Sequence, residues 1–344
     1  MVELAWNKTK GNKEKSIYKI ASLILSCIVL IFLLAVSISV GAATIHLSTV
    51  WNAVFQFDSN VQAHQIIQEI RLPRSLGAGL IGACLAVSGA ILQGLTRNPL
   101  AAPSIMGVTD GAALALIIAL VFFPALSMGE QSIASFVGAG LGTLIVFGIG
   151  ALSKGNVSPA KLALAGVAVS SLFQAITTAI ALRFDMAKNM GFWYAGGLNK
   201  VNWSGVHILF IICMIGIAAA ILMSKALTIL SLGEDVSKGL GQNTLIIKGI
   251  GFSITLFLTG AAVSVAGPIG FIGLVVPHIT RFLVGSDYRW IIPFSAVFGA
   301  ILLVLSDTAA RMVNAPFETP VGAITAIVGV PFFLYLARGE GRRV

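Results

Sequence analysis

The sequence contains very little charge for a protein of its length. Only 10% of its 344 residues are Asp, Glu, Lys or Arg, while 57% are hydrophobic and the mean hydropathy is +0.96. Soluble globular domains average about 25% charged residues, so this composition excludes that class and indicates a polytopic membrane protein. The formal net charge of +9 does not indicate nucleic-acid binding, because the basic residues stand between apolar runs, where they set orientation in the membrane.

Cysteines and catalytic motifs are also scarce. Cys27, Cys84 and Cys213 lie singly inside apolar runs, without a C-x-x-C pair, and are interpreted as small core residues. The chain has no G-x-x-x-x-G-K-[ST] loop and therefore no Walker A site of its own. No cluster of ligands suggests a metal site, and no Ser/His/Asp or paired-carboxylate arrangement suggests hydrolysis. We therefore expect no catalytic residue, no metal and no cofactor on this chain.

Ten apolar runs approach the roughly 20 residues that a helix needs to cross a bilayer, which predicts an all-α fold of about ten transmembrane helices. They are Ile20–Ala43, Leu76–Leu95, Leu100–Phe123, Ile133–Leu152, Leu162–Leu182, Val206–Met223, Leu245–Val265, Phe271–Val284, Trp290–Met312 and Val321–Leu336. The eighth run is short, so it is expected to be re-entrant or buried between neighbours. No long linker divides the chain, and residues 1–344 are predicted to form one transmembrane domain.

The first apolar run has a competing interpretation as a cleaved signal peptide, with Gly41-Ala42-Ala43 as a small-residue cleavage site. That run is longer than the roughly 7–15 residues of a usual signal core. A retained first span is the favoured interpretation.

Positive charges are distributed unevenly between the two sides of these spans. With the N-terminus inside, sixteen of the 22 Lys and Arg residues fall on the inner side, including those of the basic N-terminus 1–19 and the loop 224–244. The six on the outer side are Arg71, Arg74, Arg183, Lys188, Lys200 and Arg311. Because Lys and Arg are enriched in cytoplasmic loops, we expect both termini to be cytoplasmic.

The stretch Arg71-Leu72-Pro73-Arg74 precedes an almost uncharged apolar helix. A helix N-terminus carries a partial positive charge, so a cation there is unfavourable by roughly 0.3–1 kcal/mol. Pro73 fits such a position, because the first turn needs no N–H donor. The arginines need another reason for their place: they reach toward lipid phosphates, or they await an acidic partner.

The inner loop 231–241 has the pattern of a short amphipathic helix. Leu232, Val236 and Leu240 recur at i, i+4 and i+8 and would form one apolar edge. Glu234 and Asp235 fall in the first turn, where the helix dipole favours anions, and Gly239 or Gly241 suits the end. Such a helix can fill a groove on a partner protein, or the segment is an ordinary solvated turn; the pattern alone favours neither.

The fifth span carries polar residues on one helical face: Ser170, Gln174, Thr177 and Thr178. A polar stripe of this kind lines a wet passage, or it forms hydrogen bonds to a neighbouring helix. In the fourth span, Gly138 and Gly142 form a G-x-x-x-G pair, which predicts close helix packing.

Ionisable residues within the spans are few, and Asp110, His278 and Asp307 are the main candidates. Because a charged group is costly to place in the membrane, an ionisable residue within a span is a candidate functional residue. Three scattered groups make a poor proton or sodium relay, and for His278 a structural hydrogen bond is favoured over a metal site.

Several stretches together resemble the FecCD family, the permease subunits of type II ABC importers for ferric siderophores, haem and vitamin B12. The matching stretches, in family order, are 71–74 (RLPR), 88–94 (SGAILQG), 97–107 (RNPLA to Gly107), 232–235 (LGED), 267–273 (GPIGFIG), 277–279 (PHI) and 320–322 (PVG). They extend over nearly the whole chain, and the ten expected spans agree with that fold.

The resemblance implies a bacterial cell-membrane protein that pairs with a second permease subunit, two cytoplasmic ATPase subunits and one external substrate-binding protein. The family's docking arginines fall on Arg71, Arg74 and Arg311. The coupling segment that contacts the ATPase falls on Leu232, Gly233, Glu234, Asp235, Val236 and Gly239.

The resemblance also implies that the fifth and tenth spans flank the passage, to which Ser170, Gln174, Thr177 and Thr178 are assigned. It implies a ferric siderophore as substrate, with haem or cobalamin as the alternative. A secondary, ion-coupled transporter is the rival from a different class, and dependence of uptake on ATP or on an ion gradient separates the two.

Overall fold

The protein is described here by a computed structural model, which covers residues 2–41, 45–152, 159–315 and 317–340. The elements in chain order are α1 (Val2–Ser39), α2 (Leu47–Phe55), α3 (Gln62–Ile66), the π turn η1 (Ile67–Arg71), α4 (Leu72–Thr96), the 3₁₀ turn η2 (Pro103–Met106), α5 (Val108–Phe122), α6 (Met128–Leu152), α7 (Pro159–Arg183), α8 (Ala187–Ala195), α9 (Trp203–Ser231), α10 (Glu234–Gly239), α11 (Thr244–Ala266), α12 (Ile272–Val284), α13 (Tyr288–Val313) and α14 (Val321–Glu340). All regular structure in these residues is helical, as predicted.

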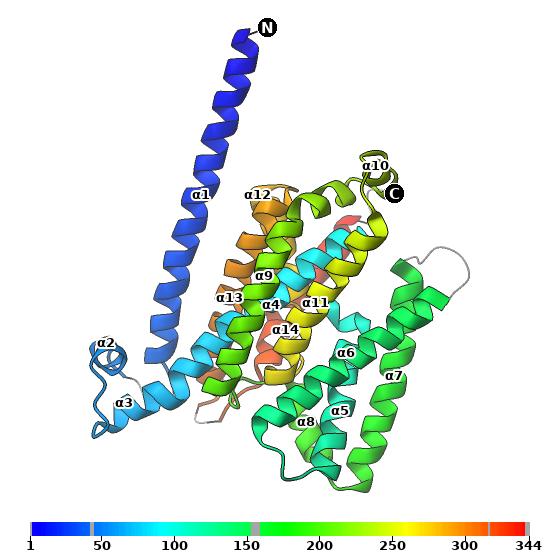
Figure 1. Cartoon of the computed structure of the whole chain (residues 1–344). Coiled ribbons are helices and arrows are strands. Elements are labelled where there is room, and N and C mark those ends of the chain that lie inside the picture. Colours follow the sequence, from blue (N-terminus) through cyan, green and yellow to red (C-terminus); the bar gives the residue numbers. More distant parts are fainter. Residues whose placement is uncertain (1, 42–44, 153–158, 316, 341–344) are drawn as a thin grey trace.

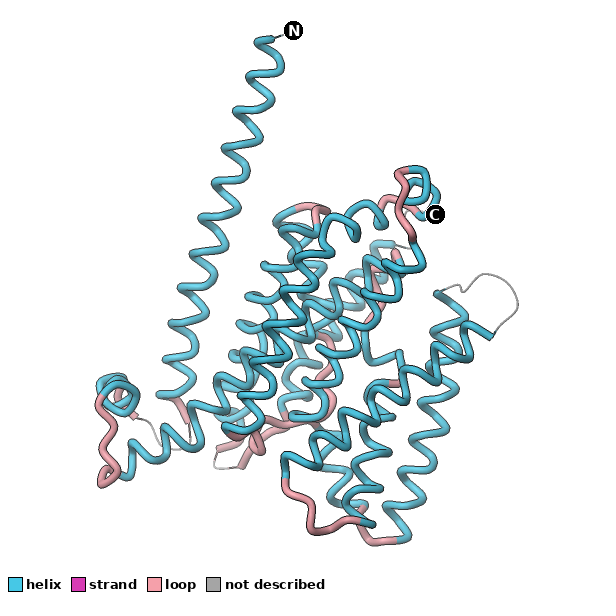
Figure 2. Tube along the Cα trace, in the orientation of Figure 1, coloured by secondary structure: helices cyan, strands magenta, loops and turns pink. Residues whose placement is uncertain are grey.

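The long helices run side by side between two distinct ends of the molecule (Figure 1). The N-terminal part of α1, the short helix α10 and the C-terminal end of α14 lie at one end, which we name the α10 end. The helices α2, α3 and α8 lie at the other, which we name the α2 end. Most connections between the long helices are short loops at one end or the other (Figure 2).

Helix α4 forms the centre of the bundle. In the stretch Gln62–Thr96, which contains α4, 83% of the apolar window is buried, against 6% for the window in α1. The helices α9, α11, α12 and α13 pack around it. Small residues allow these close approaches: Gly89 of α4 faces Gly273 of α12 so closely that a Cβ at Gly89 would overlap the Gly273 carbonyl. A helix that is apolar on all sides is expected at the centre of a bundle, and its glycines allow the neighbouring helices to approach closely.

The helices α5, α6 and α7 form a second group beside this centre. The predicted close packing at Gly138 and Gly142 is confirmed, because both face α5 or the residue that precedes it. A Cβ at Gly138 would overlap the Gly111 carbonyl, and one at Gly142 would press on the Gly107 carbonyl at 2.6 Å. The G-x-x-x-G spacing thus works as it does in lipid, where backbone approach replaces the hydrophobic effect between helices.

Seven of the helices in the described residues are long and apolar enough to cross a membrane, and three shorter apolar helices, at Val108–Phe122, Ile272–Val284 and Val321–Tyr335, match the other expected spans. All ten predicted runs therefore overlap a helix, although the number that cross stays a prediction. The eighth, α12, has 13 residues, and eight of them are buried. This short helix is therefore largely covered by its neighbours, which agrees with the prediction that the eighth run is buried between other helices.

The expected helix entrance at Arg71–Arg74 is corrected by the structure. The backbone is already helical upstream, through α3 and η1, so that Gln62–Thr96 form one span of 35 residues. Arg71 itself has helical angles, φ −77° and ψ −41°. Pro73 is accommodated by the wide π turn that precedes it, because a proline inside a helix removes one hydrogen bond and crowds the preceding turn. The arginines therefore do not face a free helix N-terminus.

Candidate functional site

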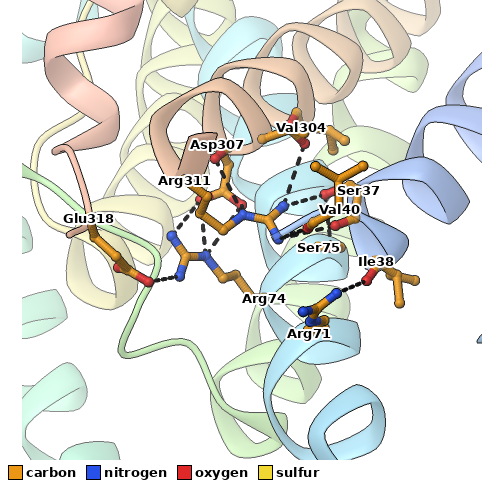
Figure 3. A network of polar contacts seen from close by, with 11 residues as sticks. Ser37, Ile38, Val40, Arg71, Arg74, Ser75, Val304, Asp307, Arg311 and Glu318 are labelled. Carbon is orange, nitrogen blue, oxygen red and sulfur yellow. Dashed lines mark hydrogen bonds and ion pairs between the residues drawn. The ribbon is translucent and has the colours of Figure 1, made fainter. Parts of the chain in front are cut away.

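The three candidate docking arginines come together at the α2 end. Arg71 closes η1, Arg74 lies in the first turn of α4, and Arg311 lies in the last turn of α13. Figure 3 shows their guanidinium groups gathered between α4, α13 and the end of α1. Each residue is less than a tenth exposed, with 8%, 7% and 9% of its surface accessible.

Arg71 and Arg311 bind the C-terminal end of α1. Arg71 Nη1 donates to the carbonyl oxygens of Ile38 and Ser39, at 2.8 and 3.0 Å. Arg311 Nη1 donates to those of Ser37 and Val40, at 3.1 and 2.9 Å (Figure 3). The last carbonyls of a helix lack partners within it and carry its negative dipole end. The two cations supply both the missing donors and the opposite charge.

Arg74 is held by two carboxylates from the C-terminal part of the chain. Its Nε and Nη2 both lie 3.0 Å from Asp307 Oδ1, and its Nη1 lies 2.5 Å from Glu318 Oε1. Asp307 has no exposed surface and also pairs with Arg311, whose Nε lies 3.1 Å from Oδ2. Buried charges are tolerated when each is paired and hydrogen-bonded, and this carboxylate between two guanidinium groups meets that condition.

The acidic partner that the sequence left unidentified is therefore present within the chain. Asp307 and Glu318 lie 233 and 244 residues from Arg74, so sequence reasoning did not connect them. One local signal was available: Asp307 and Arg311 are spaced i, i+4 on one helix, a spacing that favours ion pairs. The buried positions of the arginines also argue against lipid phosphates as their partners.

A cavity of about 790 Å³ opens beside this cluster. Its wall contains Arg74 and Glu318, together with polar and aromatic side chains from α6, α8 and the following loop. These include Gln131, Asn189, Trp193, Asn199 and Lys200. The cluster is thus accessible from one side, through the exposed half of Glu318, whose side chain is 45% exposed.

At the opposite end, the predicted short helix forms as α10. It begins after Gly233, whose φ of +139° is a conformation that only glycine adopts readily. Glu234 and Asp235 lie in the first turn, as predicted, and Gly239 is the last residue. The predicted apolar edge is exposed: Leu232, Val236 and Leu240 have 67%, 47% and 63% of their surface accessible.

One face of α10 contacts the rest of the protein, and the opposite face is exposed to solvent. Glu234 faces the protein, with its carboxylate 2.7 Å from Lys248 Nζ and 3.3 Å from Lys238 Nζ. The Lys248 ammonium, with Lys238 beside it, lowers the pKa of Glu234 to about 2. Ser237 is buried and donates to Gln242 Oε1 at 2.7 Å. Glu234 and Ser237 therefore anchor the helix, and its apolar edge is exposed.

Of the predicted coupling residues, Glu234 is thus an anchor, while Leu232, Asp235, Val236 and Gly239 point outward. Asp235 and Gly239 are exposed, and among the described residues no atom lies within 4 Å of the position that a Cβ at Gly239 would take. Gly233 sets the entry of the chain into the helix. The division follows from the helical period, because residues one turn apart share a face.

The polar residues predicted to form one stripe on the fifth span, α7, differ in how far they are exposed. Thr177 is fully buried, Ser170 is half-buried, and Gln174 and Thr178 are exposed. The four positions share one broad face, but neighbouring helices cover only part of it. Ser170 lies beside the Asp110 carboxylate of α5, and Thr177 lies close to Tyr194 of α8. Two residues of the stripe therefore lie in helix contacts, and two are exposed.

The other suspected ionisable residues have structural neighbours. The His278 ring lies edge-on to Phe332 of α14, with centroids 5.7 Å apart, and Asp307 belongs to the arginine cluster. Within the described part of the chain, no three His, Cys, Asp or Glu side chains are grouped as a metal site would require.

The comparisons with known proteins identify the family. The model of the FecCD transport family matches residues 29–339. The iron(3+)-hydroxamate import system permease protein FhuB of Bacillus subtilis (strain 168) is 60% identical over 306 residues, which cover 89% of this chain and 80% of that protein. The ferric enterobactin transport system permease protein FepD of Escherichia coli (strain K12) is 37% identical, covering 92% and 94%.

A solved structure agrees. A metal-chelate type ABC transporter in an inward-facing conformation matches with a TM-score of 0.81 and 28% identity, over 93% of this chain and 99% of the solved one. An all-helical permease fold, the matched family model and these relatives lead to one conclusion: the chain belongs to the FecCD transport family.

Proposed function

We propose that this chain is the membrane-spanning permease subunit of an ATP-driven importer that carries a ferric siderophore into the cytoplasm. The observation that carries the proposal is α10, a short helix held to the protein by Glu234 and Ser237 with an exposed apolar edge. A solvated turn would not expose three large apolar side chains on one edge. Such an edge fits a groove on a partner, and an ATPase is the partner that a permease without its own nucleotide site requires.

The α10 end is then cytoplasmic, together with both termini. The lysine and arginine distribution supports this orientation, since the topology predicted from the sequence assigns sixteen of the 22 basic residues to the inner side. The α2 end is external. There the cluster of Arg71, Arg74 and Arg311 is the proposed docking site for a substrate-binding protein with acidic contact residues.

The passage is proposed to lie between two permease subunits, along α7 and α14. In this single chain α7 packs mainly against α5 and α6, and only 17% of its apolar window is buried. Gln174 and Thr178 are on its exposed side. A second copy or a paralogue would cover this side and enclose a polar route.

In the proposed cycle, the loaded binding protein docks at the α2 end and releases the chelate between the two permeases. Closure and opening of the ATPases then move α10, and the anchored helix transmits this movement to α9 and α11, which flank it in the chain. ATP hydrolysis takes place on the separate ATPase subunits. This chain binds and orients, and contributes no bond chemistry to the cargo.

Among siderophores, a hydroxamate is the first candidate substrate. The hydroxamate permease relative is 60% identical, whereas the hemin transport system permease protein HmuU of Yersinia pestis is 38% identical. Haem is therefore the second candidate, and cobalamin is the other alternative.

The proposal is tested by reconstituting the permease in proteoliposomes with its ATPase and substrate-binding protein, for which the neighbouring genes are searched first. We expect uptake of a radio-iron trihydroxamate chelate to require ATP and to be insensitive to an ionophore. Uptake that collapses with the ionophore and ignores ATP depletion would instead identify an ion-coupled transporter. Parallel assays with haem and cobalamin compare the substrate classes.

A further inference from the structure

The two carboxylates that bind Arg74 differ in a way that the docking role does not explain. Asp307 lies on α13, has no exposed surface and pairs with two arginines. Glu318 lies outside any helix, three residues before α14, has a side chain that is 45% exposed, and forms an ion pair with Arg74. The first carboxylate is a fixed part of the core, while the second is a removable one.

The guanidinium geometry restricts where a new carboxylate can bind. Arg74 Nε and Nη2 face Asp307, and Nη1 faces Glu318. Arg74 and Glu318 both line the 790 Å³ cavity, so this edge of the guanidinium group faces the cavity; Figure 3 shows Glu318 and Asp307 approaching Arg74 from different sides. The Arg74 side chain itself is only 9% exposed. A carboxylate from outside can therefore reach Arg74 at Nη1 only by replacing Glu318.

We infer that Glu318 is a built-in competitor for the acidic residue of the external binding protein. This inference rests on the proposed function. Without the partner, Glu318 neutralises the outer edge of Arg74; on docking, the partner's carboxylate takes its place. One half-exposed ion pair is exchanged for another, so the net gain at this contact is small, and docking stays reversible and sensitive to salt.

The position of Glu318 links this exchange to the helix that flanks the proposed passage. Glu318 is followed by Thr319, whose N–H donates to the Ala310 carbonyl at 3.3 Å, and by Pro320, whose carbonyl accepts from Ala323 N at 3.0 Å. Gly322 in the first turn of α14 lies against the Ala195 carbonyl of α8. Release of Glu318 therefore removes one of the several contacts that hold the segment leading into α14, and the backbone contacts of Thr319, Pro320 and Gly322 remain.

The experiment is a titration of the reconstituted permease with the substrate-binding protein used in the uptake assay, for wild type and for Glu318→Gln. The glutamine keeps the shape and removes the competing charge. We expect the Kd for docking to fall by about two- to fivefold, the range that a half-exposed ion pair supports, and the difference to shrink at high salt.

Two matched variants complete the design. Glu318→Asp retains a carboxylate and should return the Kd toward the wild-type value. Asp185→Asn removes an exposed charge at the same end and should leave the Kd unchanged, which separates competition from a general change in surface charge. Asn is suited to that position, because Asp185 has φ +57°.

An unchanged or weaker affinity of Glu318→Gln, with normal docking of the wild type, overturns the inference and leaves the proposed function standing. A tighter affinity that Asp185→Asn reproduces also overturns it. If the wild-type permease does not bind the protein at all, while it does carry the chelate with ATP, the docking surface lies elsewhere and the inference fails. Failure of both docking and ATP-dependent uptake contradicts the proposed function as well.

Discussion

The two ends of the molecule present their candidate contact residues in opposite ways. At the α10 end, Leu232, Val236 and Leu240 are exposed, and the ion pair of Glu234 holds the helix from behind. At the α2 end, the arginines themselves are buried and bound to the chain. Exposing a narrow apolar edge to water costs little free energy, whereas burying an unpaired guanidinium group costs a great deal. In the proposed function, the first end is therefore ready for contact, whereas the second exchanges one partner for another.

The sharpest test of this comparison removes the fixed carboxylate. Asp307→Ala would leave Arg74 and Arg311 with an uncompensated buried charge, and we expect the free energy of unfolding to fall by about 3–5 kcal/mol. Thermal unfolding in detergent measures the loss. The control, Glu318→Gln, should cost less than about 1 kcal/mol, because that pair is half-exposed. Equal stabilities of the two variants would contradict the division into a fixed and a removable carboxylate.

The substitution Val236→Asp tests the proposal that the exposed apolar edge of α10 contacts the ATPase. The substituted carboxylate would be buried without a partner when α10 enters a groove, which costs several kcal/mol, so we expect co-purification of the ATPase and ATP-dependent uptake to fall at least about tenfold. The same change at the other end, Val61→Asp, should leave ATPase association intact, because Val61 is 38% exposed there and caps α3. If Val236→Asp binds the ATPase normally, α10 is not the contact.

The smallest expected effect is a pH-dependent loosening of α10 when the ion pair between Glu234 and Lys248 is lost. The pKa of Glu234 is lowered to about 2, below the value of about 4.3 for an unfolded chain. The stabilisation is therefore complete above about pH 4.3 and is lost as the pH falls toward about 2. A spin label at Asp235→Cys should become more mobile over this window. With Glu234→Gln the label should already be mobile at neutral pH, and a label that still responds to pH in that variant would show that another group is responsible.

Much of the fold could be predicted because membrane spans depend on composition over about 20 residues. Each expected run overlaps a helix, and the short eighth run is the 13-residue α12. The apolar edge of α10 was also predictable, since positions 232, 236 and 240 depend only on the helical period. The predicted helix entrance at Arg71 was wrong, because the π turn that accommodates Pro73 extends the helix upstream.

The division of the α7 stripe was not predictable in the same way. The sequence places Ser170, Gln174, Thr177 and Thr178 on one face, but it does not say where the edge of a neighbouring helix crosses that face. The structure places Thr177 in the contact and leaves Thr178, the next residue, exposed. Assignments of passage residues therefore depend on how α5, α7 and α8 pack.

The sequence by itself determined that this is a polytopic membrane protein of the FecCD family, with apolar helices and a short amphipathic segment at 231–241, because hydropathy, charge bias and short motifs are local properties. Only the tertiary structure decided what Arg71, Arg74 and Arg311 bind. Arg74 meets Asp307 and Glu318 from more than 230 residues away, and Arg71 and Arg311 meet the free carbonyls of α1. Ion pairs between distant segments follow from how the helices pack, and packing brings together charges that no local pattern relates.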